Sequence, residues 1–473
     1  MALKRLILAA LILVSTGAGV DAQLVGGRGI GGVGGIGAGG LGPRGIGGLP
    51  SNVPVTTVPG GIATPAIPSA PLSNPVGAVT QPLSTVTPGV TGTIGNTVNG
   101  VTQDVGAIAA TAGRDLVGRP LNQTLLGRDP RGLPIVPGEV LAVSPSEQSL
   151  AIARRLNFRI VRQDQLGALG LSTTVLAAPS GMDAIAALAA LRQADPTGSY
   201  DYANIYNPTG GQSTTNNTAD LTAPPSASPN TSIGMIDGGV EARHSAFASA
   251  HIVSRSFAGT GNAPATAHGT AIASLLAGAD KNFSGYAPGA TVYAADVFGG
   301  EPTGGSAAEI ALALNWLVEN KIAVANISLA GPPNVLLAAA VKAFVESGHV
   351  LVAASGNDGP AAPPNYPAAY PGVIGVTAID AAHHFALDAN RNAARFAALG
   401  VNVRAAALPA GYGSASGTSY ASPLVAARFA LLVTQPGKGN CETALATLSH
   451  EATPLSETGI AYLATPSGRV AAK

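Results

Sequence analysis

Residues 411–427, with the sequence GYGSASGTSYASPLVAA, decide the fold of this chain, and Ser419 lies at their centre. The residues before it are small, and the apolar run at 424–427 predicts a buried helix. Ser419 would begin that helix, where unpaired backbone N–H groups and a partial positive charge can stabilise an oxyanion. Pro423 agrees with this placement, because proline is tolerated in the first turn of a helix. The alternative is an N-cap serine with a structural role only.

Two upstream segments offer a base and a carboxylate to orient it. Residues 232–236 form a short apolar run that ends at Asp237 and two glycines. This pattern predicts a buried strand that carries the carboxylate at its C-terminal tip, the edge where open parallel sheets place their ligand chemistry. His268 opens a run of small and aliphatic residues, which predicts a helix inside the core.

These segments resemble the three signature motifs of the subtilisin-like (subtilase) serine peptidases, whose triad occurs in the order Asp, His, Ser. The motifs are Asp237-Gly-Gly, His268-Gly-Thr and Gly-Thr-Ser419-Tyr-Ala-Ser-Pro. The sequence departs from the family pattern at Gly238, where a serine or threonine is usual, and at Leu424, where a histidine is frequent. Because of these departures we expect a lower rate of reaction. Because neither position touches a triad residue, we expect the same reaction class.

Two further segments lie between His268 and Ser419 in the family's order. Residues 350–354 predict a strand that leads to Asn357 and are similar to the segment that supplies the family's oxyanion-hole asparagine. Residues 325–331 resemble the strand that lines the substrate cleft. The resemblance covers about residues 230–435.

The resemblance implies an endopeptidase acting on proteins and peptides through an acyl-enzyme. It assigns catalysis to Asp237, His268 and Ser419, and the oxyanion hole to Asn357 and the Ser419 backbone N–H. By the same resemblance, substrate binding falls to Ser328, Leu329, Ala330 and Gly356. No acidic residue occurs in those segments, so an apolar pocket is expected. Calcium is common in the family, but the sequence shows no dense acidic loop; we assign no metal ligand and expect no other cofactor.

Composition narrows the function classes. The chain has 473 residues, 46% of them hydrophobic, and 25 basic residues balance 25 acidic ones. A basic face for nucleic-acid binding is therefore not expected. Cys441 is the sole cysteine, which excludes an intrachain disulfide and favours a buried thiol. The histidines other than His268 lack the spacing of metal ligands, so we expect structural or solvent-exposed roles for them. Asp296 also ends an apolar strand, but it lacks the glycines that would expose it as they expose Asp237, so we expect a structural carboxylate.

The N-terminal third predicts export and processing. Residues 1–22 have a short basic region, an apolar core and a small-residue cut site, which is typical of a signal peptide, so we expect a secreted, periplasmic or surface protein without a stable transmembrane segment after signal cleavage. The alternative is that this segment is retained as an N-terminal anchor. Residues 23–118 are rich in Gly, Pro, Ser and Thr and predict a flexible tether. Residues 207–230 predict a linker in which processing takes place.

Between the tether and the linker, residues 137–206 predict the order β-α-β-β-α-β, a ferredoxin-like α+β domain. This order and its position resemble the subtilase propeptide, which implies an inhibitor and folding assistant. The alternative is an accessory domain without an inhibitory role.

Residues 230–473 predict strands that alternate with helices, and hence an α/β fold with a mostly parallel sheet covered by helices on both faces. A noncatalytic subtilase-like surface scaffold or adhesive protein is the main alternative function, and a secreted esterase is a second. The filled catalytic positions argue against the scaffold.

Overall fold

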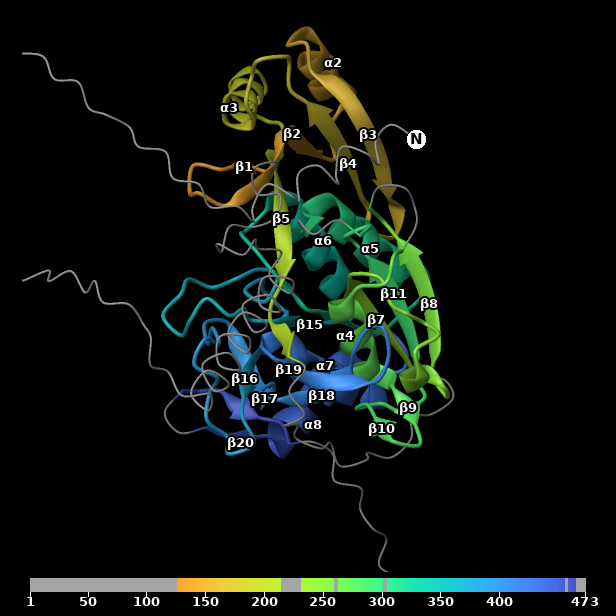
Figure 1. The fold of residues 1–473 in the computed structure, drawn as a ribbon. Helices are drawn as coiled ribbons and strands as arrows, with labels where there is room; N and C mark the ends of the chain where they lie inside the picture. Colours follow the sequence, from red (N-terminus) through yellow and green to blue (C-terminus); the bar gives the residue numbers. More distant parts are fainter. Residues whose placement is uncertain (1–125, 214–230, 259–262, 301–303, 456–457, 465–473) are drawn as a thin grey trace, which may run out of the picture. The chain divides into compact units, whose positions relative to one another are not determined.

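A computed structural model describes residues 126–213, 231–258, 263–300, 304–455 and 458–464 (Figure 1). The predicted signal peptide and low-complexity tether lie outside the described residues. Most of the predicted linker over residues 207–230 also lies outside them.

The C-terminal part of the described chain is built on a nine-stranded sheet in the order β20-β21-β17-β16-β15-β13-β7-β11-β8. Neighbouring strands from β21 to β8 are all parallel, and β20 pairs antiparallel at one edge. The strands are β7 (Ser232–Asp237), β8 (His251–Ser256), β11 (Thr291–Asp296), β13 (Val324–Ile327), β15 (Val350–Ala354), β16 (Ile374–Ile379), β17 (Ala394–Leu399), β20 (Thr453–Pro454) and β21 (Ala461–Tyr462).

Helices bury both faces of this sheet, because successive strand residues point to opposite sides. Val350 and Val352 pack in one apolar cluster with residues of α4 (Ala267–Ala277), α7 (Thr418–Leu432) and α8 (Lys438–Glu451). Leu351 and Ala353 pack in another with residues of α5 (Ala307–Glu319) and α6 (Val335–Glu346). The predicted α/β fold with a mostly parallel sheet and helices on both faces is confirmed.

Short elements complete this part of the described chain. They are η3 (Ser245–Phe247), β9 (Ala279–Asp280), β10 (Phe283–Ser284), β12 (Gly305–Ser306), β14 (Leu329–Ala330), β18 (Val403–Ala406) and β19 (Tyr412–Ser416).

Residues 127–208 form a smaller body, here called the N-terminal lobe. Its central strands follow the order β5-β2-β4-β3, and every pair is antiparallel. This is the ferredoxin-like order that the sequence predicts. The elements are β1 (Gly127–Arg128), β2 (Pro134–Val143), α2 (Glu147–Arg155), β3 (Arg159–Leu166), η2 (Gly167–Leu169), β4 (Leu171–Ala177), α3 (Ala184–Ala194) and β5 (Tyr200–Pro208).

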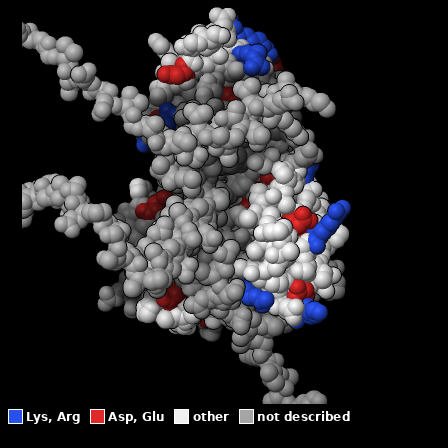
Figure 2. Space-filling view, in the orientation of Figure 1, with Lys and Arg blue, Asp and Glu red and all other residues white. Residues whose placement is uncertain are grey.

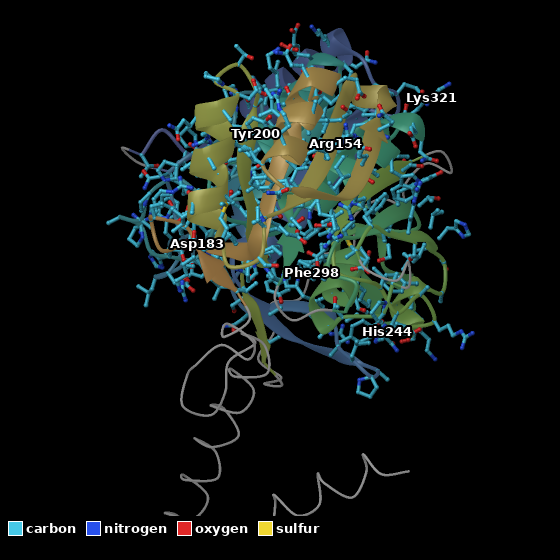
Figure 3. All side chains as sticks on the ribbon, turned by 90° about the horizontal axis from the view of Figure 1, so that it is seen from above. Arg154, Asp183, Tyr200, His244, Phe298 and Lys321 are labelled. Carbon is cyan, nitrogen blue, oxygen red and sulfur yellow. The ribbon has the colours of Figure 1, made fainter. Side chains whose placement is uncertain are left out.

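A capping bond and a charge at a helix end stabilise the two helices of the lobe. The Asp183 carboxylate accepts a hydrogen bond from the backbone N–H of Ala186 and starts α3, and Arg154 lies in the last turn of α2 (Figure 3). A negative charge at the start of a helix and a positive charge at its end both oppose the partial charges of the helix termini.

On the face shown in Figure 2, Lys and Arg side chains lie among Asp and Glu side chains and mostly uncharged residues.

The sheet of the N-terminal lobe is buried on both faces. On one face Val140, Leu176 and Tyr200 form an apolar core with α2 and α3. On the other face Leu141 and Val175 belong to the cluster that contains α5 and α6. The lobe and the C-terminal part therefore share one hydrophobic core, and we call this shared surface the lobe interface.

The last strand of the lobe continues beyond its own sheet. β5 pairs antiparallel with β12 on one side and with β14 on the other, and after Gly210 the chain forms β6 (Gly211–Ser213) beside β19. The sequence predicts a strand that ends at Tyr206 and a linker from residue 207; the structure instead has β5 run to Pro208. The reason is tertiary, since β12 and β14 supply the pairing partners.

Candidate active site

Asp237 ends the buried strand β7, as predicted. Its side chain is fully buried, and its Oδ1 accepts a hydrogen bond of 2.7 Å from the Gly238 backbone N–H. Gly238 leaves room for Thr266, because a Cβ at that position would lie 2.5 Å from the Thr266 Oγ1. The Thr266 hydroxyl therefore lies close to the place where the side chain of the family's usual serine or threonine would begin.

His268 lies in the first turn of α4, which Thr266 caps by accepting a hydrogen bond from the Gly269 N–H. The His268 Nδ1 is 2.8 Å from the Asp237 Oδ1. This bond selects the tautomer that carries its proton on Nδ1 and leaves a lone pair on Nε2. Within the described part of the chain, the buried Nε2 has no hydrogen-bond partner. The Tyr420 ring packs edge-on against the imidazole, with 5.5 Å between the ring centroids.

Ser419 is the second residue of α7 and is fully buried. The helix starts after Gly417, whose φ of +136° favours glycine and brings the chain close to residue 210. The triad assigned by the resemblance leads us to expect the Ser419 hydroxyl within hydrogen-bond reach of His268. In the structure the Ser419 Oγ instead donates to the Ser328 carbonyl at 2.9 Å.

A chain of hydroxyl groups explains this orientation. The Gly356 N–H donates to the Thr418 Oγ1, which donates to the Thr209 Oγ1 at 3.2 Å. The Thr209 Oγ1 lies 2.6 Å from the Ser419 Oγ, and the Thr209 N–H donates to the same oxygen at 3.0 Å. Because Ser419 receives these hydrogen bonds, its own proton is directed to Ser328 and away from His268.

The predicted oxyanion donors border one small space. The Ser419 backbone N–H donates to the carbonyl oxygen of Thr209 at 3.1 Å. The Asn357 Oδ1 accepts a hydrogen bond from the Thr418 N–H, which fixes the amide group. A Cβ on Gly417 would lie 2.7 Å from the Asn357 Nδ2 and 2.9 Å from the Thr209 oxygen, so both atoms face the space that this glycine leaves open.

Three of the four predicted substrate-binding residues contact residues 207–209 of the same chain. The Ser328 carbonyl accepts a hydrogen bond from the Thr209 N–H at 3.3 Å, and Leu329 and Ala330 pair with Pro208 and Asn207. Gly356 has a φ of +101°, and a Cβ there would collide with Asn365. Its backbone holds Thr418 in place.

Sequence reasoning missed β12, β19 and Thr209. The two residues of β12 pair with Tyr206 and Ile205 of β5, but in the sequence they are only the glycine and the capping serine before α5. Thr209 lies in a stretch rich in Thr, Asn, Ser and Pro that predicts a linker. No local signal distinguishes it, because its role comes from contacts with residues far away in the chain.

A model described as the subtilase family matches residues 228–464. The chain belongs to the subtilase family. Minor extracellular protease Epr of Bacillus subtilis is 36% identical over 170 residues, which cover 35% of this chain and 26% of that protein. Subtilisin DY of Bacillus licheniformis is 33% identical over 221 residues, which cover 44% of this chain and 77% of that protein. The matched stretch thus spans about a quarter of the first relative and about three quarters of the second.

This subtilase chain also shares its fold with a solved structure. Fervidolysin from Fervidobacterium pennivorans, a keratinolytic enzyme related to subtilisin, aligns with a TM-score of 0.57 at 20% identity. The alignment covers 71% of this chain and 60% of fervidolysin. At this identity the likeness concerns the fold.

Within the described ranges, no three His, Cys, Asp or Glu side chains are grouped so that they could hold a metal ion. Across the same residues, every helix is too short or too polar to cross a membrane.

Proposed function

We propose that this chain is a secreted serine endopeptidase of the subtilase family, with Asp237, His268 and Ser419 as its triad. One observation carries the proposal: a peptide carbonyl of the chain, that of Thr209, accepts a hydrogen bond from the Ser419 N–H beside the hydrogen-bonded Asp237 and His268 pair. Export rests on the signal-peptide pattern of residues 1–22.

In the proposed reaction the Ser419 hydroxyl turns from Ser328 to the free lone pair of the His268 Nε2. His268 takes the proton while the serine oxygen attacks the substrate carbonyl, and Asp237 holds the imidazole in the tautomer that this step needs. His268 then protonates the leaving amine. Water, activated by the same imidazole, hydrolyses the acyl-enzyme and restores the serine hydroxyl.

Two donors, the Ser419 N–H and the Asn357 side-chain amide, stabilise the negative charge that develops on the carbonyl oxygen in the proposed reaction. Both are fixed before the reaction by the start of α7 and by the bond from the Thr418 N–H to the Asn357 Oδ1. Donors that need no reorganisation stabilise the transition state more than the ground state.

The N-terminal lobe acts in this proposal as an inhibitory propeptide. Its sheet buries one face against α5 and α6, and its last strand pairs with both β12 and β14. Polar contacts add to the lobe interface: the Asp201 Oδ2 accepts from the N–H of Val335, the first residue of α6, at 2.8 Å, and Arg162 pairs with Glu309 at 3.0 Å. A protein substrate cannot enter while this strand is in place.

The test is to treat the processed protein with a fluorophosphonate that labels activated serines, and to assay hydrolysis of casein and of short-chain esters. We expect labelling of Ser419, preferential hydrolysis of casein, and loss of both in Ser419→Ala. An unlabelled, inert but folded protein would favour the noncatalytic scaffold. Hydrolysis of esters without hydrolysis of casein would favour the esterase.

A further inference from the structure

We propose that the enzyme cuts its own chain between Thr209 and Gly210. This inference rests on the proposed function and adds the position of the bond. The chain lies across Ser419 as a continuous peptide: β5 pairs with β12 and β14 before the bond, and β6 pairs with β19 after it.

Hydrogen bonds to Thr209 place one carbonyl at the nucleophile. The Thr209 N–H donates to the Ser328 carbonyl and to the Ser419 Oγ, and the Thr209 carbonyl accepts from the Ser419 N–H. Thr209 is only 8% exposed. Its carbonyl therefore lies where the proposed oxyanion hole acts, and the next peptide bond is the one to Gly210.

The residue after the bond has a conformation that favours glycine. Gly210 has a φ of +131°, and a Cβ there would lie 2.7 Å from the Ser416 carbonyl oxygen and 2.9 Å from the Tyr420 ring. Any larger residue in this place would push the chain away from Ser419.

Tyr206 fixes the register of the strand, three residues before Thr209. Its ring is fully buried, and its hydroxyl donates to the Pro332 carbonyl at 2.6 Å. Gly331 makes room for the ring, because a Cβ at that position would lie 2.6 Å from it. A shift of the strand by one residue would take the tyrosine out of this site and bring another bond to Ser419.

The step is an ordinary hydrolysis. The Ser419 Oγ forms an ester with the Thr209 carbonyl carbon, the bond to the Gly210 nitrogen breaks, and the serine proton passes through His268 to that nitrogen. Water then splits the ester. The products are a Thr209 carboxylate, a Gly210 amine and the original serine hydroxyl.

The test follows the purified full chain over time by intact mass and N-terminal sequencing. We expect the earliest new N-terminus to be Gly210-Gly211-Gln212, with a rate that does not depend on protein concentration, and no cut in Ser419→Ala. Gly210→Ala should slow this cut by about tenfold or more, since a displacement on the order of 1 Å at a reacting atom costs about 10²-fold.

Gly167→Ala is the matched control. Gly167 lies within the N-terminal lobe, and a Cβ there meets nothing within 4 Å, so the rate should not change. Thermal unfolding of the Gly210→Ala chain in the Ser419→Ala background tests whether the variant folds.

The outcomes separate the two proposals. A first cut at another bond by a chain that hydrolyses casein overturns this inference and leaves the endopeptidase intact. A Gly210→Ala chain that is folded and cut at this bond at the original rate also overturns it. A chain that stays whole and reacts with neither casein nor fluorophosphonate overturns both.

Discussion

The side-chain oxygen of Thr209 lies 2.6 Å from that of Ser419, whereas the buried His268 Nε2 has no hydrogen-bond partner among the described residues. The nucleophile is thus engaged by the residue whose carbonyl it would attack. The hydroxyl chain from Thr418 through Thr209 to Ser419 holds the serine proton on the Ser328 carbonyl.

Thr209→Val should accelerate self-cleavage, because valine keeps the shape of threonine without the hydroxyl that competes with His268 for Ser419. We expect a gain of about two- to tenfold, the worth of one ordinary hydrogen bond. Thr209→Ser keeps the hydroxyl and serves as the control. The measurement is the first-order rate of cleavage by gel densitometry, and a slower Thr209→Val chain would show that the hydroxyl assists the reaction.

Asn357→Ala should lower kcat on a chromogenic peptide by about 10²–10³ with little change in KM, which is the typical loss when a subtilisin-type site loses this donor. The asparagine acts mainly on the charge that forms in the transition state. The steady-state constants of the processed enzyme decide the point. An effect on KM alone would contradict the oxyanion role.

The buried site of Tyr206 predicts a preference for peptide substrates. The processed enzyme should cleave Tyr-Asn-Pro-Thr-p-nitroanilide with a kcat/KM about ten- to a hundredfold above that of Ala-Asn-Pro-Thr-p-nitroanilide, the value of burying one large side chain. Gly331→Ala should remove most of this difference, because its Cβ occupies the place of the ring. Equal rates for the two peptides with the original enzyme would exclude the preference.

The N-terminal lobe, made separately as residues 127–209, should inhibit the processed enzyme. Asp201→Ala should weaken this inhibition by about five- to thirtyfold, because it removes a carboxylate from the first N–H of α6. Glu147→Ala removes an exposed charge from the first turn of α2 and is the control. Circular dichroism must show equal folding of the variants. Equal inhibition constants for the original lobe and the Asp201→Ala lobe would show that the Asp201 contact does not contribute to binding.

The lobe also predicts a pH dependence of stability. Burial, followed by the charge of Glu309, raises the pKa of Glu139 above its ordinary value of 4.5, while Arg162 and Arg159 oppose the shift. An acid with a raised native pKa stabilises the fold fully below its unfolded pKa, and this contribution is lost as the pH rises through the native value. Glu139→Gln should therefore raise the unfolding temperature of the Ser419→Ala chain at pH 7 and not at pH 4. A shift of the same size at both pH values would contradict this assignment.

Much of the fold could be predicted from the sequence because its signals are local. Apolar runs of strand length alternate with helix-length runs, and the motifs around Asp237, His268 and Ser419 each lie at the end or start of such an element. The bond between His268 and Asp237 follows from that placement. The positions of Thr209, β12 and β19 could not be predicted, since each depends on pairing between segments that are distant in the chain and carry no apolar period of their own.

The shared core of the N-terminal lobe and helices α5 and α6 makes the covalent cut and the gain of activity two separate events. Breaking one peptide bond leaves the apolar contacts of Leu141 and Val175 in place, so the severed lobe stays bound until it dissociates or is digested. The delay before activity appears is then set by the time for which the severed lobe stays bound. In a time course the full-length band should disappear before hydrolysis of a chromogenic peptide rises, and dilution should shorten the lag.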